Sequence, residues 1–234
     1  AGCKNNGQES DVAQNQEEHT DKTEDGAKTK ITIAASPTPH VEILNQVKDL
    51  LAEQGYQLEI IEFSDYVQPN LVVDEEDVDA NYFQHQPYLD DFNKEQGTKL
   101  VSVAKIHYEP LGVYAGKSSD LADIPDGAII GIPNDTTNEA RALLLLESNG
   151  LIRIKEGAGL AATKNDIVEN PHNIEIVELE AAQISRRISE FDFVVLNGNY
   201  ALDAGLNISD AIAKEEQNSE SAQKYANIIA VKEG

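Results

Sequence analysis

From Ile31 onward the chain alternates short apolar runs with segments whose apolar residues recur at helical spacing, and this alternation limits the fold more than any other feature. Ile31–Ala35 predicts a buried strand, Val41–Gln54 predicts a helix that ends at Gly55, and Leu58–Phe63 predicts a second strand. A strand, a helix and a strand in succession favour parallel pairing, because parallel strands need a long connection between them. The sequence therefore predicts an α/β protein.

The same pattern continues along the chain. Further strands are predicted at Lys99–Ala104, Gly112–Ala115, Ala128–Ile132, Ile174–Leu179, Phe191–Leu196 and Ala226–Val231. Further helices are predicted at Thr137–Ser148 and near Gln86–Glu95, Lys164–Glu169 and Ala181–Ser189. We expect two lobes, the first formed by residues 31–110 and 200–234 and the second by residues 111–199. Ligands of open α/β sheets bind beyond the carboxyl ends of the strands, so polar residues at those ends form the candidate site.

Composition excludes several classes of function. The 234 residues include 42 acidic and 18 basic side chains, and the formal net charge of −24 repels the phosphates of nucleic acids. No apolar run approaches the length of about 20 residues that a membrane-spanning helix needs. The single cysteine excludes an intramolecular disulfide, and the five histidines lack zinc-ligand spacing, so we expect no metal site. The sequence contains no phosphate loop and no dinucleotide fingerprint, and we expect no cofactor.

The first thirty residues differ from the rest of the chain. Small residues directly before Cys3 are what a signal peptidase accepts at a lipoprotein cleavage site, so we expect Cys3 to carry a lipid. The alternative is a free thiol in an ordinary tail. Residues 4–30 contain almost no apolar side chain, so we expect residues 1–30 to form a disordered acidic tether between a membrane and the folded body.

An aromatic cluster is the richest local feature. Tyr82, Phe83, His85 and Tyr88 fall within seven residues, and together they can line an apolar slot with one polar wall. We expect this cluster in a loop, where it lines a ligand site. The alternative is that the rings belong to the core and that His85 is a buried histidine with internal partners.

A polar cluster follows the predicted strand Ala128–Ile132. Asp135, Thr136 and Thr137 are all candidate helix caps, and Asn138 and Arg141 share one helix face because they are three residues apart. An arginine fork matches a carboxylate, and the start of a helix attracts anions. The cluster therefore predicts a site for a ligand carboxylate. The alternative is a surface ion pair of Arg141 with one of the many acidic residues.

Two further asparagines are candidate ligand contacts. Asn197 directly follows a predicted strand, and Asn227 lies within an otherwise apolar one. An asparagine amide can accept from an ammonium group and donate to a carboxylate. A buried Asn227 needs a partner, and a ligand is one candidate. The alternative for Asn197 is that it simply forms a turn.

Six longer runs occur in a fixed order along the chain: Ser64–Asn70, Asp79–His85, Pro133–Asn138 with Arg141–Leu146, Val168–Pro171, Ile176–Glu180 and Tyr225–Ile229. In these runs the sequence resembles the NlpA-type lipoproteins, the substrate-binding lipoproteins of methionine ABC transporters. The resemblance extends over about Ile31–Gly234, nearly the whole predicted folded part.

The resemblance implies a two-lobed periplasmic-binding-protein fold, similar to type II, that closes on a free amino acid without catalysis. It implies L-methionine as ligand, a permease with an ATPase subunit as partners, and a lipid anchor on Cys3 that holds the protein on the extracytoplasmic face of the membrane. By motif, Arg141 binds the ligand carboxylate. Asn138, Asn197 and Asn227 hold the carboxylate and ammonium ends. The thioether side chain is lined by Tyr66, Phe83, His85 and Tyr88.

Three alternatives remain open. The ligand can be another amino acid or a methionine-containing dipeptide, because the sequence does not give the volume of the slot. An extracytoplasmic enzyme would pair His85 with a carboxylate such as Asp79, which requires both groups within reach of one substrate proton. A lipoprotein that only binds other proteins would have no small-molecule ligand.

The chain departs from the family pattern at two places. Residues 74–77 are all acidic where a turn glycine is expected. The sequence also ends at Gly234, where most relatives continue into a further helix, so we expect a truncated C-terminus.

Overall fold

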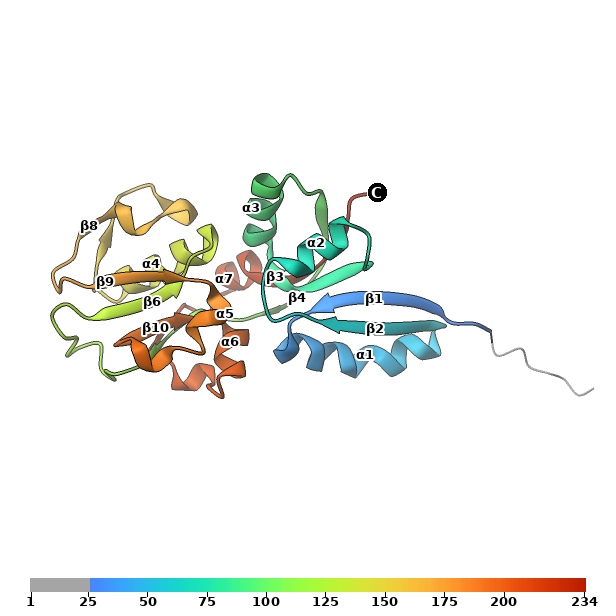
Figure 1. Cartoon of the computed structure of the whole chain (residues 1–234), viewed down its shortest axis with the longest axis horizontal. Coiled ribbons are helices and arrows are strands. Elements are labelled where there is room, and N and C mark those ends of the chain that lie inside the picture. Colours follow the sequence, from blue (N-terminus) through green and yellow to red (C-terminus); the bar gives the residue numbers. More distant parts are fainter. Residues whose placement is uncertain (1–25) are drawn as a thin grey trace, which may run out of the picture.

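The computed structural model describes residues 26–234, so Cys3 and most of the predicted tether lie outside the described residues. Figure 1 shows two lobes side by side, each built around a five-stranded sheet. The α/β class and the two-lobed architecture predicted from the sequence are therefore confirmed. No helix in the described part of the chain is both long and apolar enough to cross a membrane.

The first lobe contains a sheet in the order β2-β1-β3-β12-β4. Its strands are β1 Thr29–Ala35, β2 Tyr56–Glu62, β3 Ala80–His85, β4 Leu100–Tyr108 and β12 Ala226–Lys232. β1 runs parallel to β2 and β3, as the strand–helix–strand pattern predicts, whereas β12 is antiparallel to both β3 and β4.

Helices cover both faces of this sheet (Figure 1). They are α1 Glu42–Glu53, α2 Gln68–Asp74 and α3 Gln86–Gln96. Alternate side chains of β1 point to opposite faces, so Ile33 packs with Leu44 of α1 while Ala34 packs with Val73 of α2 and Leu89 of α3. A sheet buried on both faces needs such continuous apolar strands, which is why β1 reads as an apolar run.

The second lobe contains a sheet in the order β11-β5-β10-β6-β9. Its strands are β5 Gly112–Ala115, β6 Ile129–Pro133, β9 Glu175–Leu179, β10 Phe193–Leu196 and β11 Ala213–Lys214. Its helices are α4 Thr136–Ser148, α5 Ala181–Ile184 and α6 Gly198–Asp203, with the small antiparallel pair β7 Arg153–Ile154 and β8 Ile167–Glu169 beside them. The short helix α7 Ser219–Lys224 precedes β12 on the way back to the first lobe.

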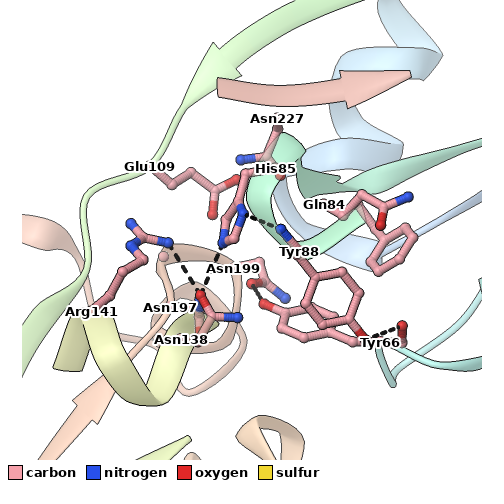
Figure 2. A pocket seen from close by; sticks show the side chains of 12 residues that line it. Tyr66, Gln84, His85, Tyr88, Glu109, Asn138, Arg141, Asn197, Asn199 and Asn227 are labelled. Carbon is pink, nitrogen blue, oxygen red and sulfur yellow. Dashed lines mark hydrogen bonds between the residues drawn. The ribbon is translucent and has the colours of Figure 1, made fainter. Parts of the chain in front are cut away.

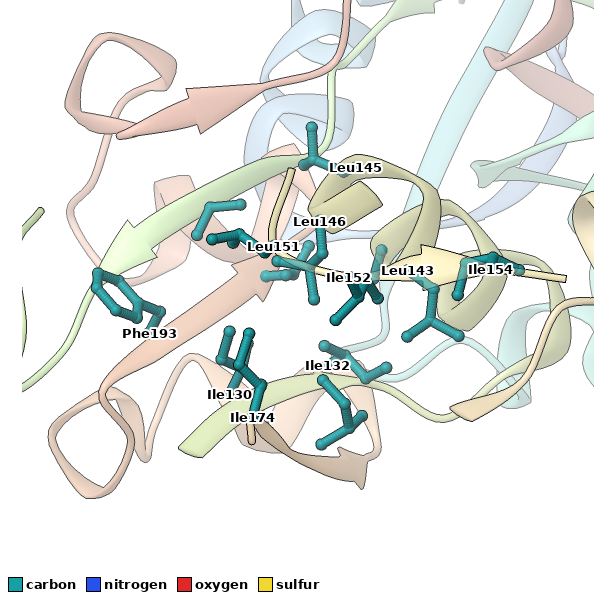
Figure 3. Close-up of a cluster of buried hydrophobic side chains, with 14 of the residues drawn as sticks. Ile130, Ile132, Leu143, Leu145, Leu146, Leu151, Ile152, Ile154, Ile174 and Phe193 are labelled. Carbon is teal, nitrogen blue, oxygen red and sulfur yellow. The ribbon is translucent and has the colours of Figure 1, made fainter. Parts of the chain in front are cut away.

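Helix α4 supplies the centre of the largest core. Leu143 and Leu146 are fully buried there against Ile130 and Ile132 of β6 and Phe193 of β10 (Figure 3). Because α4 begins directly after β6, this packing also fixes the first turn of α4, where several candidate site residues lie.

One predicted lobe boundary is wrong. We expected the chain to return to the first lobe at residue 200, but Ala213 and Lys214 of β11 pair with β5 in the second sheet. The polar residues after β10 form the start of helix α6, and the chain does not return to the first lobe there. The pairing therefore assigns β11 to the second lobe, and the exact division of the chain into lobes stays a prediction.

Three local predictions also fail. Lys164–Glu169 is a short 3-10 turn followed by β8, because Ile167 pairs with Ile154 of β7. The helix predicted over Ala181–Ser189 ends at Ile184 and is followed by a separate turn. Tyr82, Phe83 and His85 of the aromatic cluster expected in a loop lie instead on β3, a strand at the centre of the sheet that is buried along its whole length, and Tyr88 lies in the first turn of α3.

The acidic segment after α2 adopts the conformation that the missing glycine would favour. Glu76 has a φ of 64°, in the left-handed region where glycine is the usual residue. The turn therefore forms without glycine, at the cost of some backbone strain at Glu76.

Replacement of Leu143 by alanine tests the central role of α4. We expect Leu143→Ala to lower the free energy of unfolding by about 3 kcal/mol, because it leaves a cavity in a closely packed core. Urea unfolding followed by circular dichroism measures this. Leu50→Ala is the control, since Leu50 of α1 is 56% exposed and we expect a change below about 0.5 kcal/mol. Equal effects of the two variants would contradict this account of the core.

Candidate ligand-binding site

A cavity with about 350 Å³ of empty space lies between the two lobes (Figure 2). It is lined by Tyr66, Phe83, Gln84, His85, Tyr88, Glu109, Asn138, Arg141, Asn197, Gly198, Asn199 and Asn227. All eight residues that the sequence analysis proposed for ligand binding are in this set. The fold therefore brings them to one place, although they come from segments up to 161 residues apart (66 to 227).

The first lobe supplies an aromatic wall. The ring of Tyr66 lies 5.7 Å, centroid to centroid, from the rings of both Phe83 and Tyr88. The Tyr88 hydroxyl donates to the Tyr66 backbone carbonyl oxygen at 2.7 Å, which fixes the Tyr88 ring, and the Tyr66 hydroxyl donates to Asn199 Oδ1. Tyr82, which the sequence groups with them, points to the other face of β3 and packs with the α1 side of the sheet.

Beneath this wall a buried amide cluster fixes β3 against α2. Asn70 donates to Gln84 at 2.9 Å, Gln84 donates to Asn81 at 3.0 Å, and Asn81 donates to the Pro69 carbonyl at 2.9 Å. All three amide side chains are buried, and their mutual hydrogen bonds offset the cost of removing them from water. Gln84, which lines the cavity and which the sequence analysis missed, belongs to this cluster.

His85 joins the aromatic wall to the polar side of the cavity. Its Nδ1 accepts from the Tyr88 backbone N–H at 3.1 Å, which caps helix α3. Its Nε2 therefore carries the proton and donates to Asn138 Oδ1 at 3.0 Å. Burial, together with the nearby charge of Arg141, lowers the pKa of His85 to about 3, so the ring is neutral at physiological pH. Asp79 does not line this cavity but bonds Thr32, so the enzyme alternative lacks its proposed pair.

The first turn of α4 forms the polar wall of the second lobe. Asp135 caps the helix by accepting from the Asn138 N–H at 3.1 Å and from the Asn138 side-chain amide at 2.8 Å. Asn138 Oδ1 is thereby turned to the cavity, where it also accepts from Arg141 and Asn197, each at 3.2 Å. Burial raises the pKa of Asp135 to about 6, although the hydrogen bonds from Asn138 act against the shift.

Arg141 is held by an acidic partner that the sequence analysis did not identify. Glu215 accepts from Arg141 Nε at 2.8 Å and from Nη2 at 2.6 Å, and the guanidinium lies 4.1 Å from the centre of the Tyr225 ring. Burial lowers the pKa of Arg141, but the hydrogen bond and charge of Glu215 more than offset this, so the pKa is raised overall. Arg141 is buried, so the predicted alternative of a surface ion pair is wrong.

Glu215 also binds the chain segment that connects the two lobes. Glu215 Oε2 also accepts from the Leu111 N–H at 3.0 Å, where the chain crosses from one lobe to the other. The hydrogen bonds to Glu215 and to Asn138 together leave two of the five N–H groups of Arg141 without a hydrogen bond in the described structure. Arg141 can therefore bind a ligand carboxylate while Glu215 holds its other edge.

Further polar atoms at the cavity lack partners within the described residues. Asn197 Oδ1 and Asn199 Nδ2 are buried without a hydrogen bond. One is an acceptor and the other a donor, so together they suit a ligand that carries groups of both kinds. Asn199 was missed by the sequence analysis, although it lies only two residues from Asn197.

Glu109 brings a carboxylate to the opposite side of the cavity from the aromatic wall (Figure 2). The sequence analysis did not identify this residue. It lies against Gly198, where an added Cβ would come within 2.8 Å of Glu109 Cβ and Oε2, so only glycine allows this approach. The cavity thus contains one buried cation, Arg141, and one carboxylate, Glu109.

Glu109 also belongs to the one group in the described chain with a metal-binding geometry. Ligand atoms of His40, His107 and Glu109 lie within 4.8 Å of one another, although their sequence positions gave no such indication. Zinc accepts this ligand set. The same atoms already form hydrogen bonds within the protein, His107 to Tyr82 and Glu109, and His40 to Asn227. Hydrogen bonds within the protein thus engage His107, Glu109 and His40 Nε2, whereas His40 Nδ1 is buried without a hydrogen-bond partner in the described structure.

Comparison with known proteins identifies relatives of similar sequence and structure. The sequence model of the NlpA lipoprotein family matches residues 31–234. The D-methionine-binding lipoprotein MetQ of Salmonella typhimurium is 44% identical over 182 residues, which are 76% of this chain and 66% of that protein. The match thus spans just under two thirds of the Salmonella protein.

Solved structures agree with this relationship. A nutrient-binding protein from Burkholderia cenocepacia, solved bound to methionine, is 46% identical with a TM-score of 0.82, over 86% of this chain and 84% of that one. A periplasmic substrate-binding protein of an ABC transporter from Coxiella burnetii is 41% identical with a TM-score of 0.81, over 87% and 85% of the two chains.

Replacement of Glu215 by glutamine tests the buried ion pair. We expect Glu215→Gln to lower the free energy of unfolding by about 3 kcal/mol, because it leaves the Arg141 charge buried without its counter-ion. Urea unfolding measures this. Glu190→Gln is the matched control: its partner Arg187 is exposed, and we expect a loss below about 0.5 kcal/mol. A Glu215→Gln variant as stable as the control would refute the role assigned to the pair.

The raised pKa of Asp135 predicts a pH-dependent stability. The folded protein holds this proton up to about pH 6, whereas the unfolded chain releases it near the ordinary value of 3.8. As pH rises from 4 to 7, the wild type should therefore lose about 2 kcal/mol of stability relative to Asp135→Asn, whose asparagine still caps the helix. Urea unfolding of both proteins at several pH values tests this. A difference in stability that does not change with pH would contradict the prediction.

Proposed function

The chain belongs to the NlpA lipoprotein family, and on this basis we propose that it is the extracytoplasmic substrate-binding lipoprotein of an ABC importer, with L-methionine as its ligand. The family consists of substrate-binding transport lipoproteins, which are not enzymes. Methionine is what the Burkholderia relative binds, and the Salmonella relative is named for D-methionine, so the stereochemistry of the ligand is part of the proposal.

The observation that carries the proposal is the division of the cavity into three chemically distinct parts. Arg141 and the free amide of Asn199 supply donors, Glu109 and Asn197 Oδ1 supply acceptors, and Tyr66 with its neighbours supplies an aromatic wall. A free amino acid with an apolar side chain has these same three parts: a carboxylate, an ammonium group and a side chain that prefers to leave water.

We assign the ends of the ligand by charge. The two remaining N–H groups of Arg141 bind the carboxylate, since a guanidinium matches a carboxylate in geometry and charge. The neutral His85 is held by its hydrogen bond to Asn138 Oδ1. The same oxygen accepts from Arg141 and Asn197 and so orients them as well. The ammonium group is assigned to Glu109, Asn197 and Asn227, which line the cavity and whose side chains each carry an acceptor oxygen.

The side chain of the ligand lies against Tyr66, Phe83 and Tyr88, with His85 at the edge of this wall. The sulfur of methionine is favoured beside aromatic ring edges, by about 1 kcal/mol. A wall of three rings therefore suits a thioether better than it suits a polar side chain such as that of glutamine.

The cavity belongs to both lobes, so the ligand links them. His85 of the first lobe bonds Asn138 of the second, the Tyr66 hydroxyl bonds Asn199, and the Tyr200 hydroxyl donates to the Ser64 carbonyl at 2.8 Å. A closed form of this kind is what we expect the permease and its ATPase subunit to receive. We further propose that Cys3 carries the lipid that anchors the protein and that the residues after it form the tether. The tether ends before β1, because Thr29 and Lys30, predicted as part of it, belong to that strand and pair with β2.

A second candidate ligand is a methionine-containing dipeptide or another amino acid. A neighbouring hollow with about 760 Å³ of empty space shares Tyr66 and Tyr88 with the main cavity and adds Asp65, Asp135 and Tyr200. Movement of the two shared rings would join the spaces and make room for a larger ligand. The acidic lining of the hollow would suit a ligand with a positive charge at that end.

Calorimetric titration of protein that has been unfolded and refolded, to remove any bound ligand, tests the proposal. We expect one L-methionine per chain and weaker binding of D-methionine, leucine, glutamine and glycyl-methionine. Tighter binding of the dipeptide would favour the second candidate, and no binding of any of these by a folded protein would refute both.

Arg141→Lys tests the proposed carboxylate contact. The lysine keeps the charge but lacks the planar fork, so we expect at least about tenfold weaker binding of L-methionine. Arg187→Lys, at an exposed arginine remote from the cavity, is the matched control and should bind as the wild type does. Unchanged affinity in a folded Arg141→Lys variant would remove Arg141 from the proposed site.

A further inference from the structure

Two histidines lie behind the acceptor side of the cavity without lining it. His40 belongs to the turn Pro37–Val41 that follows β1, and His107 lies near the end of β4. Each contacts a residue that does line the cavity: His107 bonds Glu109, and His40 bonds Asn227. Glu109 and Asn227 are two of the three residues assigned above to the ligand ammonium group.

The hydrogen bonds of His107 have a defined direction. Its Nε2 faces Glu109 Oε1, and a carboxylate can only accept, so this nitrogen carries the proton. In the neutral ring, Nδ1 then accepts from the Tyr82 hydroxyl. Burial raises the pKa of Tyr82, so the hydroxyl keeps the proton that it donates. The chain from Tyr82 through His107 to Glu109 therefore satisfies every partner and fixes one carboxylate oxygen.

His40 holds the second acceptor in the same way. It is fully buried, and its Nε2 lies 2.8 Å from Asn227 Oδ1, to which it donates. The same nitrogen is 3.7 Å from Glu109 Oε1. Edge-on contacts with the rings of Tyr82 at 4.7 Å and His107 at 5.0 Å leave the imidazole little freedom to rotate.

On its other side, Glu109 lies close to Gly198 of the second lobe. Oε1 faces the histidines, and Oε2 lies at the start of α6, where Gly198 leaves room only for a hydrogen. A glutamate side chain has several rotamers, and holding it in one before the ligand arrives removes an entropy cost from binding. The carboxylate is thus held through Oε1 by His107, while Glu109 still lines the cavity.

We propose that His40 and His107 are positioning residues that hold the oxygens of Asn227 and Glu109 for the ligand ammonium group and so make the site selective for ligands with a free amine. The inference rests on the proposed function, because it assumes an amino-acid ligand. It adds a role for two residues that do not touch the ligand.

Two ligands separate positioning of the ammonium acceptors from a general structural role. L-methionine carries the ammonium group, whereas 2-hydroxy-4-(methylthio)butanoate has the same carboxylate and thioether with a hydroxyl in its place. Binding of both is measured calorimetrically in the presence of EDTA, so that no metal ion held by His40, His107 and Glu109 can replace their hydrogen bonds. The variants are His107→Phe, Glu109→Gln, the double variant, and His107→Gln, whose amide can still donate to Glu109.

We expect His107→Phe to weaken L-methionine binding by about tenfold or more and to change binding of the hydroxy acid by less than about threefold, since only the ammonium group needs the fixed carboxylate. His107→Gln should recover most of the loss. The double variant should bind L-methionine no more weakly than Glu109→Gln alone, because the histidine acts through Glu109. His172→Phe, at a histidine outside the cavity, should match the wild type.

Equal weakening of both ligands by His107→Phe, or additive losses in the double variant, would overturn the inference while leaving the proposed function intact. Additivity is measured with L-methionine alone, so it decides the matter even if the hydroxy acid binds too weakly to titrate. Absence of L-methionine binding by the wild type would instead overturn the proposed function and the inference with it.

Discussion

The buried ion pair between Arg141 and Glu215 is the interaction on which the cavity depends. Arg141 comes from the first turns of α4, Glu215 follows β11, and the Leu111 N–H that Glu215 also binds lies where the chain passes between lobes. A buried guanidinium is unfavourable without a counter-ion. The segment around Leu111 and helix α4 must therefore keep their relative positions, because Glu215 binds both. The pair thereby links the position of Arg141, which lines the cavity, to the chain segment that connects the two lobes.

The two ends of the cavity are built on the same physical principle. On the donor side, Glu215 holds the guanidinium of Arg141 from outside the cavity, and Asn138 holds it from the cavity wall. On the acceptor side, His107 holds the carboxylate of Glu109 in the same manner. The charges of Arg141 and Glu109 are thus kept apart. Each is stabilised by its own hydrogen-bond partner, so the two do not need to pair with each other across the cavity. A zwitterion placed between them meets a complementary charge at each end.

Much of this could be predicted from the sequence because it depends on local pattern. Apolar runs and helical spacing gave β1, α1, β6 and α4 close to their observed bounds, since burial imposes those periods directly. The eight candidate residues were found because arginine, asparagine and aromatic side chains stand at strand ends or within runs that resemble one family. The failures have physical reasons as well. β3 was mistaken for a loop because a strand with polar Asn81, Gln84 and His85 looks unlike a buried one until their internal hydrogen bonds are known.

By itself, the sequence determined the class of fold, the acidic charge, the family and the kinds of side chain that line the cavity. Only the tertiary structure decided that Glu109 faces the cavity, that Glu215 rather than solvent pairs with Arg141, and that His40 and His107 meet behind the wall. These contacts join residues 74 and 67 positions apart, Arg141 to Glu215 and His40 to His107. No periodicity encodes such distances, because they follow from which strands become neighbours once the two sheets have formed.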